Sequence, residues 1–425
     1  MGPRDERHTP QDDLFRCELV ELIDPRHPLM RLEGRIDWSV WERERSELFA
    51  SSTGRRAAPA RMIAGLLYLQ HAHEFPTDPS SLTRWRQRIG EEGVELLLAD
   101  TVDVAKREGV VKRQSLERVT VDTTVEEKAI RYPTDAKLYA RRIRNLTTVA
   151  QQHDGPLRQS RARKALEALL MVNRYAKARQ MKRMRRMTKR LKTYHGRVTR
   201  DIERNIDGAP ENIQVAFREP LHRANRLLNQ IRKSKNKLLS WHAPEVEVIG
   251  TGKVAKPCEF GVKLSVAVTN KDSFVVGCRS MPNNPFDGHT LAGTLEQTEI
   301  LSGVEPNCRY VDRGYKGAAI AGVQIFRSGQ KRGVNTRTLK RELKRRGAVG
   351  AVIGDMKNGH RMDRCRLKGV LGDALTAVLV SAGHNVRLLL QAVVALLRQL
   401  LHRLLEIIGF GNRDRHSDSS VQVAV

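Results

Sequence analysis

The sequence predicts an α/β protein whose strands are interrupted, after the first one, by a long basic helical segment. Three observations support this prediction. Residues 118–124 have the pattern of a strand, residues 137–239 are helical and strongly basic, and strand and helix patterns alternate after Pro244. Such alternation is typical of α/β domains. The 425 residues are enough for two or three domains.

The composition is that of a folded protein with a large excess of positive charge. Lys and Arg number 76 against 48 Asp and Glu, which gives a net charge of +28, and 40% of the residues are hydrophobic. A charge of this size binds polyphosphates through counterion release. Nucleic acid is therefore the expected partner. The net charge alone would also be compatible with an RNA- or ribosome-associated protein.

The cysteines and the apolar segments favour a cytoplasmic, nucleoid-associated protein. The five cysteines share no CxxC or Cys/His spacing, which argues against a disulfide framework or a zinc finger. The N-terminus has no apolar signal core, and the most apolar stretch, 388–410, is interrupted by Arg398, His402 and Arg403. We expect a packing helix in this stretch and no membrane span.

Two helices are predicted near the N-terminus. Residues 58–73 carry apolar side chains at helical spacing, and a second helix begins at the capping signal 78–81. Two helices joined by a short turn suggest a helix-turn-helix, whose second helix would present basic side chains to DNA. These side chains are Arg84, Arg86 and Arg88. The alternative is a solvated basic face on a packing helix.

The densest positive charge lies in residues 174–192, where ten of nineteen residues are Lys or Arg and none is acidic. Met181, Met184 and Met187 recur every three residues, so we expect an amphipathic helix with one packed face and one face toward phosphates. The residues expected to contact DNA are Lys182, Arg183, Arg185, Arg186 and Lys189. The alternative is a charged face that only keeps the protein soluble.

The second half of the chain has the patterns of a mixed sheet with helices. A hairpin is expected first, then a helix, a strand, a further strand and a last helix. These elements are expected at 259–269 with 274–280, 287–301, 310–312, 323–326 and 339–357.

Two aspartates, Asp122 and Asp312, stand at the C-terminal edges of predicted strands. Acids brought together from neighbouring strand ends can hold divalent metal ions for phosphodiester chemistry. Taken singly, an Asp at a strand end is more often a turn or capping residue. The two aspartates therefore indicate a metal site only in combination with the sequence around them.

That surrounding sequence contains several long motifs, at 121–124, 259–263, 284–291, 311–317 and 360–362. In this order they resemble the DDE transposases of bacterial insertion sequences of the insertion-sequence-five type, over nearly the whole chain. The resemblance implies an RNase H-like catalytic core, a helical N-terminal DNA-binding region and Mg²⁺- or Mn²⁺-dependent cleavage and strand transfer. Its substrates would be double-stranded DNA, namely the element's terminal inverted repeats and target DNA, bound by a homodimer.

The resemblance makes Asp122 and Asp312 the first two metal-binding acids and leaves the third acid missing. In the family, that acid is a Glu four residues after an Arg and seven before a Lys. Here Arg346 and Lys357 have those positions and Gly350 stands between them. Positions four and seven residues apart share a helix face, so both cations are expected beside DNA phosphates.

We therefore expect an impaired transposase. The alternative is a catalytically inactive DNA-binding remnant, or a repressor of an active transposase. Neither Asp355 nor Glu342 is spaced to replace the missing carboxylate. The family also has additional sequence before residue 79, so the N-terminal region of this chain is shortened.

The expected domains follow from these patterns. They are a helical N-terminal DNA-binding region at 1–112, the first part of the RNase H-like core at 113–136, a basic helical insertion at 137–245, the remainder of the core with C-terminal helices at 246–410, and a polar tail at 411–425.

Overall fold

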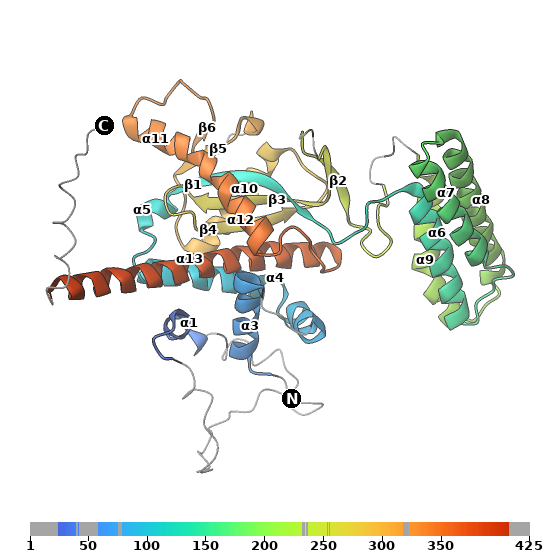
Figure 1. Ribbon diagram of the computed structural model, residues 1–425, viewed down its shortest axis with the longest axis horizontal. Helices are drawn as coiled ribbons and strands as arrows, with labels where there is room; N and C mark the ends of the chain where they lie inside the picture. The colour runs from blue at the N-terminus through green and yellow to red at the C-terminus, as the bar shows by residue number, and fades with distance from the viewer. Residues whose placement is uncertain are drawn as a thin grey trace, which may run out of the picture.

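The computed structural model describes a mixed sheet with helices on both faces and a helical bundle to one side (Figure 1). The α/β class predicted from the sequence is therefore confirmed. The residues described are 24–39, 41, 58–74, 79–231, 234, 237–252, 254, 256–317 and 323–407.

Strand β1 (Arg118–Glu127) lies inside the sheet, between one antiparallel and one parallel neighbour. It pairs antiparallel with β3 (Cys258–Thr269) and parallel with β5 (Cys308–Val311). The outer strands are β2 (Glu247–Gly250) and β4 (Val275–Met281), both antiparallel to β3, and β6 (Gln324–Arg327), parallel to β5. The predicted hairpin and the three other predicted strands are confirmed.

Helices cover both faces of the sheet, with α10 (Asp287–Ser302) on one face and α12 (Val349–Gly359) on the other, and α13 (Gly369–Ile407) contributes buried residues to the hydrophobic clusters of both faces. Val121 of β1 packs in one hydrophobic cluster with α10 and α13. Val266, opposite Asp122 in the β1–β3 register, packs on the other face against α12. Because side chains alternate along a strand, Asp122 points to the α12 side.

The helix predicted at 339–357 is divided in two. It consists of α11 (Arg337–Arg345) and α12, joined by a 3₁₀ turn, η3, at Arg346–Ala348. The tighter turn changes the helical register between the two pieces. The spacing predicted one regular helix face for Arg346, Gly350 and Lys357. Because Arg346 lies in the 3₁₀ turn, it departs from that face.

The N-terminal helices pack on the core rather than apart from it. Figure 1 shows α1 (Pro28–Glu33), α3 (Ala60–His73) and α4 (Pro79–Arg107) beside the long helix α13. Their buried side chains share one cluster with those of α13 and α10. Helix α4 bends at Gly90, where φ is 65°. The predicted helix pair is present. Of the capping signal at 78–81, residue 78 and the side chains of residues 79–81 lie outside the described part of the structure.

The basic insertion is a bundle with its own core, which confirms a helical segment after the first strand. Ile143, Leu191 and Phe217 are among its buried residues. Its four helices are α6 (Asp135–Gln152), α7 (Ala162–Lys177), α8 (Met181–Ile206) and α9 (Glu211–Asn229).

Helix α13 includes residues 388–407 of the apolar stretch predicted as a packing helix, and residues 408–410 lie outside the described residues. Its segment Gly369–Ala395 is long and apolar enough to cross a membrane, yet 72% of the most apolar window is buried inside the protein. It packs against α3, α4 and β4. Within Gly369–Ala395, this burial fits the packing helix expected from the sequence.

Candidate active site

The two predicted acids lie side by side at one place on the sheet. Val121 of β1 is paired with Val311 of β5, and Asp122 and Asp312 are the next residues on these parallel strands. The side chain of Asp122 is 23% exposed and that of Asp312 is 49% exposed. Two carboxylates thus reach the surface together on the side of the sheet covered by α12.

Arg346, the first residue of η3, lies between these two carboxylates. Its Nη2 is 2.9 Å from Oδ2 of Asp122, and its Nη1 is 3.2 Å from Oδ1 of Asp312. The sequence analysis expected this side chain to face DNA phosphates. In the structure it is 15% exposed and its charge is directed at the acids.

The environment of Asp122 opposes its ionisation. Burial raises the pKa of this carboxyl above its usual value, and the negative charge of Asp312 acts in the same direction. The positive charge of Arg346 and a hydrogen bond of 2.9 Å from the backbone N–H of Thr123 partly offset the shift. The acid pair therefore needs a cation, and Arg346 supplies it here.

The position of the missing third acid has room for a side chain. Gly350 lies on α12, one turn after Arg346, and is exposed. A Cβ atom added to it would meet no heavy atom within 4 Å. Glycine therefore leaves an open position one turn after Arg346, the residue that contacts the aspartate pair.

The two nearby acids that could have replaced it are bound elsewhere. Glu342 is 8% exposed, forms an ion pair with Arg118 and accepts a hydrogen bond from the hydroxyl of Tyr310. Asp355 lies farther along α12 and pairs with two histidines. Both observations agree with the expectation that neither acid serves as the third carboxylate.

The sequence reasoning missed a further carboxylate, which contacts Thr123, the residue after Asp122. Asp287, at the start of α10, accepts a hydrogen bond of 3.1 Å from the hydroxyl of Thr123. Its Oδ1 also lies 2.9 Å from Nζ of Lys263, which compensates its charge. The motif at 284–291 contained this residue, but its contacts with Thr123 and Lys263 depend on the fold of the sheet.

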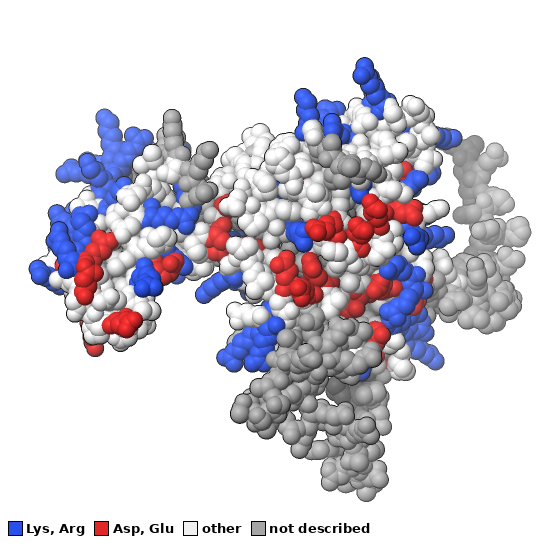
Figure 2. Space-filling view, turned by 180° about the vertical axis from the view of Figure 1, so that it is seen from behind, with Lys and Arg blue, Asp and Glu red and all other residues white. Residues whose placement is uncertain are grey.

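The five cations predicted on α8 form an exposed row on the bundle. Met184 and Met187 pack against the bundle core, as the amphipathic pattern predicted, whereas Met181 is 45% exposed and does not belong to the packed stripe. Figure 2 shows Lys and Arg gathered on the bundle. The exposed row consists of Lys182, Arg183, Arg185, Arg186 and Lys189.

The three arginines predicted on α4 have different environments. Arg84 and Arg88 are exposed. Arg86 is 6% exposed and donates a hydrogen bond to Gln70 of α3, so its predicted role in DNA contact is wrong. The reason is helical geometry, since Arg86 follows Trp85 on the face that packs against the core. Burial lowers the pKa of Arg86 to about 10.

Lys357, the last predicted cation, lies near the C-terminal end of α12. Its side chain is 19% exposed, and Nζ lies 3.5 Å from Oε2 of Glu259 on β3. This ion pair links the lysine to strand β3. It does not bring Lys357 to the aspartate pair, which Arg346 contacts directly.

Comparison with known proteins identifies the family. Residues 17–90 match the family model described as "Transposase domain (DUF772)". The chain is 39% identical over 198 residues to "Uncharacterized protein ORF8 in nfe locus" of Rhizobium meliloti, covering 40% of this chain and 95% of that protein. No solved structure matches. The chain therefore belongs to the transposase family whose members carry this domain.

Proposed function

We propose that this protein is a DDE transposase of the insertion-sequence-five type that binds the ends of its element but is impaired in cutting them. The observation that carries the proposal is the position of Asp122 and Asp312, each of which directly follows the last residue pair, Val121 and Val311, of the parallel β1–β5 ladder. Membership in a transposase family supports it. The mixed sheet, with a bundle inserted after β1, agrees with an RNase H-like core.

The donor set fits one Mg²⁺ or Mn²⁺ ion. Mg²⁺ keeps several waters and is commonly held by one or two carboxylates together with substrate phosphates. Asp122 and Asp312 provide those carboxylates once Arg346 moves away from them. The bound ion would polarise the scissile phosphate and activate the attacking water or 3′-hydroxyl.

The impairment follows from Gly350. Two ions close together repel each other and need several carboxylates to hold them, and this chain has no side chain at the third position. Arg346 adds to the effect, because its guanidinium occupies the space between the two acids where a cation would bind. Impaired cleavage is thus expected together with intact DNA binding.

The bundle supplies the expected contact with double-stranded DNA. The exposed row on α8 presents five positive charges on one rigid helix, and none of the five is paired with an acid in the described part of the chain. Contacts of this kind are made to phosphates and carry affinity more than sequence preference. We propose that a homodimer binds the two terminal inverted repeats at the bacterial nucleoid.

A second candidate function is a DNA-binding remnant, or a repressor of an active relative, and Gly350 is the observation that favours it. Incubation of end-containing DNA with the protein and Mg²⁺ or Mn²⁺ separates the two. Slow metal-dependent nicking supports the impaired transposase, and binding to ends without nicking supports the remnant. Binding with no preference for element ends contradicts both.

A further inference from the structure

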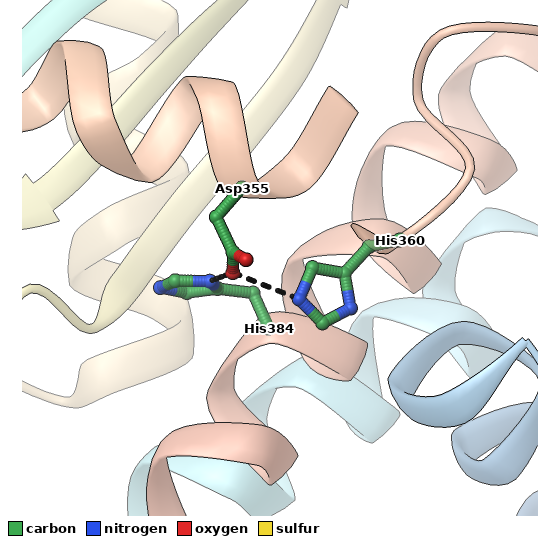
Figure 3. A group of neighbouring side chains, drawn as sticks. All are labelled: Asp355, His360 and His384. Carbon is green, nitrogen blue, oxygen red and sulfur yellow. Dashed lines mark hydrogen bonds and ion pairs between the residues drawn. The ribbon is translucent and has the colours of Figure 1, made fainter. Parts of the chain in front are cut away.

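A second group of possible metal ligands lies at the far end of α12 from Gly350 (Figure 3). Asp355 comes from α12, His360 directly follows that helix, and His384 comes from α13. Oδ2 of Asp355 is 2.9 Å from Nε2 of His360 and 2.7 Å from Nδ1 of His384. One oxygen and two nitrogens from three parts of the chain therefore converge on one point.

The opposite nitrogens of both rings face backbone carbonyls. Nδ1 of His360 lies 2.6 Å from the carbonyl oxygen of His71, and Nε2 of His384 lies 3.2 Å from that of Ser273. A carbonyl oxygen only accepts, so at 2.6 Å Nδ1 of His360 is the protonated nitrogen. In a neutral ring, the lone pair of Nε2 then points at the carboxylate of Asp355.

This arrangement is the one that histidine ligands adopt around metals. A metal-bound His almost always donates its other N–H to a carbonyl or carboxylate, which fixes the tautomer and the ring orientation. Without a positive species at the point of convergence, the lone pair of His360 would face a carboxylate oxygen. His360 is fully buried, and the ligand atoms of Asp355, His360 and His384 all lie within 4.8 Å of one another.

We propose that Asp355, His360 and His384 bind one divalent transition-metal ion, of which Zn²⁺ is the first candidate. Imidazole ligands favour Zn²⁺ and its neighbours over Mg²⁺. Two histidines and one carboxylate leave a fourth position for water, and Asp355, with 36% of its side chain exposed, lies on the accessible side.

The geometry requires only a small adjustment to take the ion. Tetrahedral ligands at about 2.0–2.1 Å from Zn²⁺ lie about 3.3 Å from one another, so the distances from the Asp355 oxygen to the two nitrogens must lengthen by roughly 0.4 and 0.6 Å. Arg387 holds the other oxygen, Oδ1, at 2.9 Å, which leaves Oδ2 as the single ligand atom. Arg387 also donates to the carbonyls of Ala72 and Gly359, so it is a positioning residue for the site.

The ion would have a structural role. It would join the C-terminal end of α12 to α13, and through His71 to α3, while the N-terminal end of α12 carries Gly350. The site would thus fix the helix that positions the third-acid residue. It is distinct from the Asp122–Asp312 pair in location and in ligand type.

Metal titration of the full-length protein tests this site. After treatment with a chelator, the protein should bind one equivalent of Zn²⁺ or Co²⁺ and unfold at a higher temperature when loaded, and Co²⁺ should show the visible absorption of a tetrahedral site. Asp355→Asn and His384→Ala should each weaken this binding at least about 100-fold, because each removes a ligand.

Three control variants separate this site from other sites on the protein. Asp122→Asn and Asp312→Asn should keep the full equivalent, since they alter only the aspartate pair. His289→Ala, which removes an exposed histidine, should also keep it. If Asp355→Asn binds Zn²⁺ as tightly as the unmodified protein, or no saturable equivalent is found, the proposal is overturned and the cluster is a hydrogen-bonded one. Because Asn has nearly the same size as Asp, Asp355→Asn is expected to fold, and it still tests the proposal if His384→Ala fails to fold.

Discussion

Arg346 and Asp122 form an ion pair across 224 residues of chain, with 2.9 Å between Nη2 and Oδ2. The same guanidinium reaches Asp312 at 3.2 Å, so one arginine compensates two acids. In a site proposed to hold a divalent ion, this contact means that the ion and Arg346 compete for the same oxygens.

Replacing Arg346 with Gln should therefore increase the affinity of the aspartate pair for Mn²⁺. We expect about a tenfold gain, since removing a competing charge beside partly exposed carboxylates is worth about 1–2 kcal/mol. A Mn²⁺ titration followed by electron paramagnetic resonance measures it. Arg346→Lys keeps the charge and should show a smaller gain, and Asp122→Asn added to Arg346→Gln should remove it. Equal Mn²⁺ affinity in Arg346→Gln and the unmodified protein would show that Arg346 does not compete.

Neutralising four cations on α8 should weaken DNA binding about equally for all sequences. Changing Arg183, Arg185, Arg186 and Lys189 to Gln should also reduce the slope of log affinity against log salt by up to about 4, which is about one unit for each phosphate that the variant no longer neutralises. Binding measured at several salt concentrations gives this slope. Changing the exposed Lys112 and Arg113, which lie outside the bundle, should leave it nearly unchanged. An unchanged slope in the α8 variant would place the DNA elsewhere.

Substitutions at Arg84 and Arg86 should have different effects, although the two residues are close in sequence. Arg84→Ala removes an exposed cation and should lower the preference for element ends by about fivefold or more, the value of one base contact. Arg86→Met should instead lower the unfolding temperature, because it removes a buried hydrogen bond to Gln70. Competition binding with the DNA that flanks the gene, and thermal unfolding, measure the two effects. A loss of end preference in Arg86→Met without loss of stability would reverse this assignment.

The bundle should lose stability as the pH falls below about 6.5. Burial, followed by the charges of Arg142 and Lys192, lowers the pKa of His195 to about 3. The unfolded chain takes up the proton first, so stability is full above the unfolded pKa and is lost as the pH falls towards the folded one. At pH 5 the loss from this residue is about 2 kcal/mol.

Urea unfolding at pH 7.5 and pH 5 measures this loss. His195→Leu and His195→Gln cannot take up a proton, and both should show a smaller difference between the two pH values than the unmodified protein. The Gln variant keeps polar atoms in the buried position, so it separates titration from polarity. If the Gln variant and the unmodified protein lose the same stability, another group causes the pH dependence.

Local patterns predicted most elements of the fold, because they depend on neighbouring residues. The hairpin at β3 and β4, the helix α10 and the basic helix α8 all follow from periodicity and turn residues within each segment. The sequence also predicted that Asp122 and Asp312 come together from two strands, although β1 continues to Glu127 and only Asp312 follows the end of its strand. The family resemblance added the third-acid position, Gly350.

The errors and omissions concern contacts between distant segments. The burial of Arg86 depends on α3 and α13, which pack against α4. The contact of Arg346 with both acids depends on the 3₁₀ turn between α11 and α12, which the spacing did not predict. The group of Asp355, His360 and His384 was missed because α12 and α13 meet only in the folded chain. A lone His in a helical pattern gives no signal of its partners.

The rate at which Gly350→Glu cuts end-containing DNA in Mg²⁺ or Mn²⁺ tests most directly whether the protein is a transposase impaired at its third acid. The added side chain has open space, and a carboxylate there should raise cleavage at least about 100-fold, since a metal ion in place contributes several kcal/mol to the transition state. Gly350→Gln, of equal size but without charge, should give no gain.

Adding Asp122→Asn to Gly350→Glu should abolish the gain, because it removes another of the proposed metal ligands. We expect little cleavage by the unmodified protein, rapid cleavage by Gly350→Glu and none by the double variant. The proposed function is contradicted if the unmodified protein already cuts as fast as Gly350→Glu, or if Gly350→Gln cuts equally well.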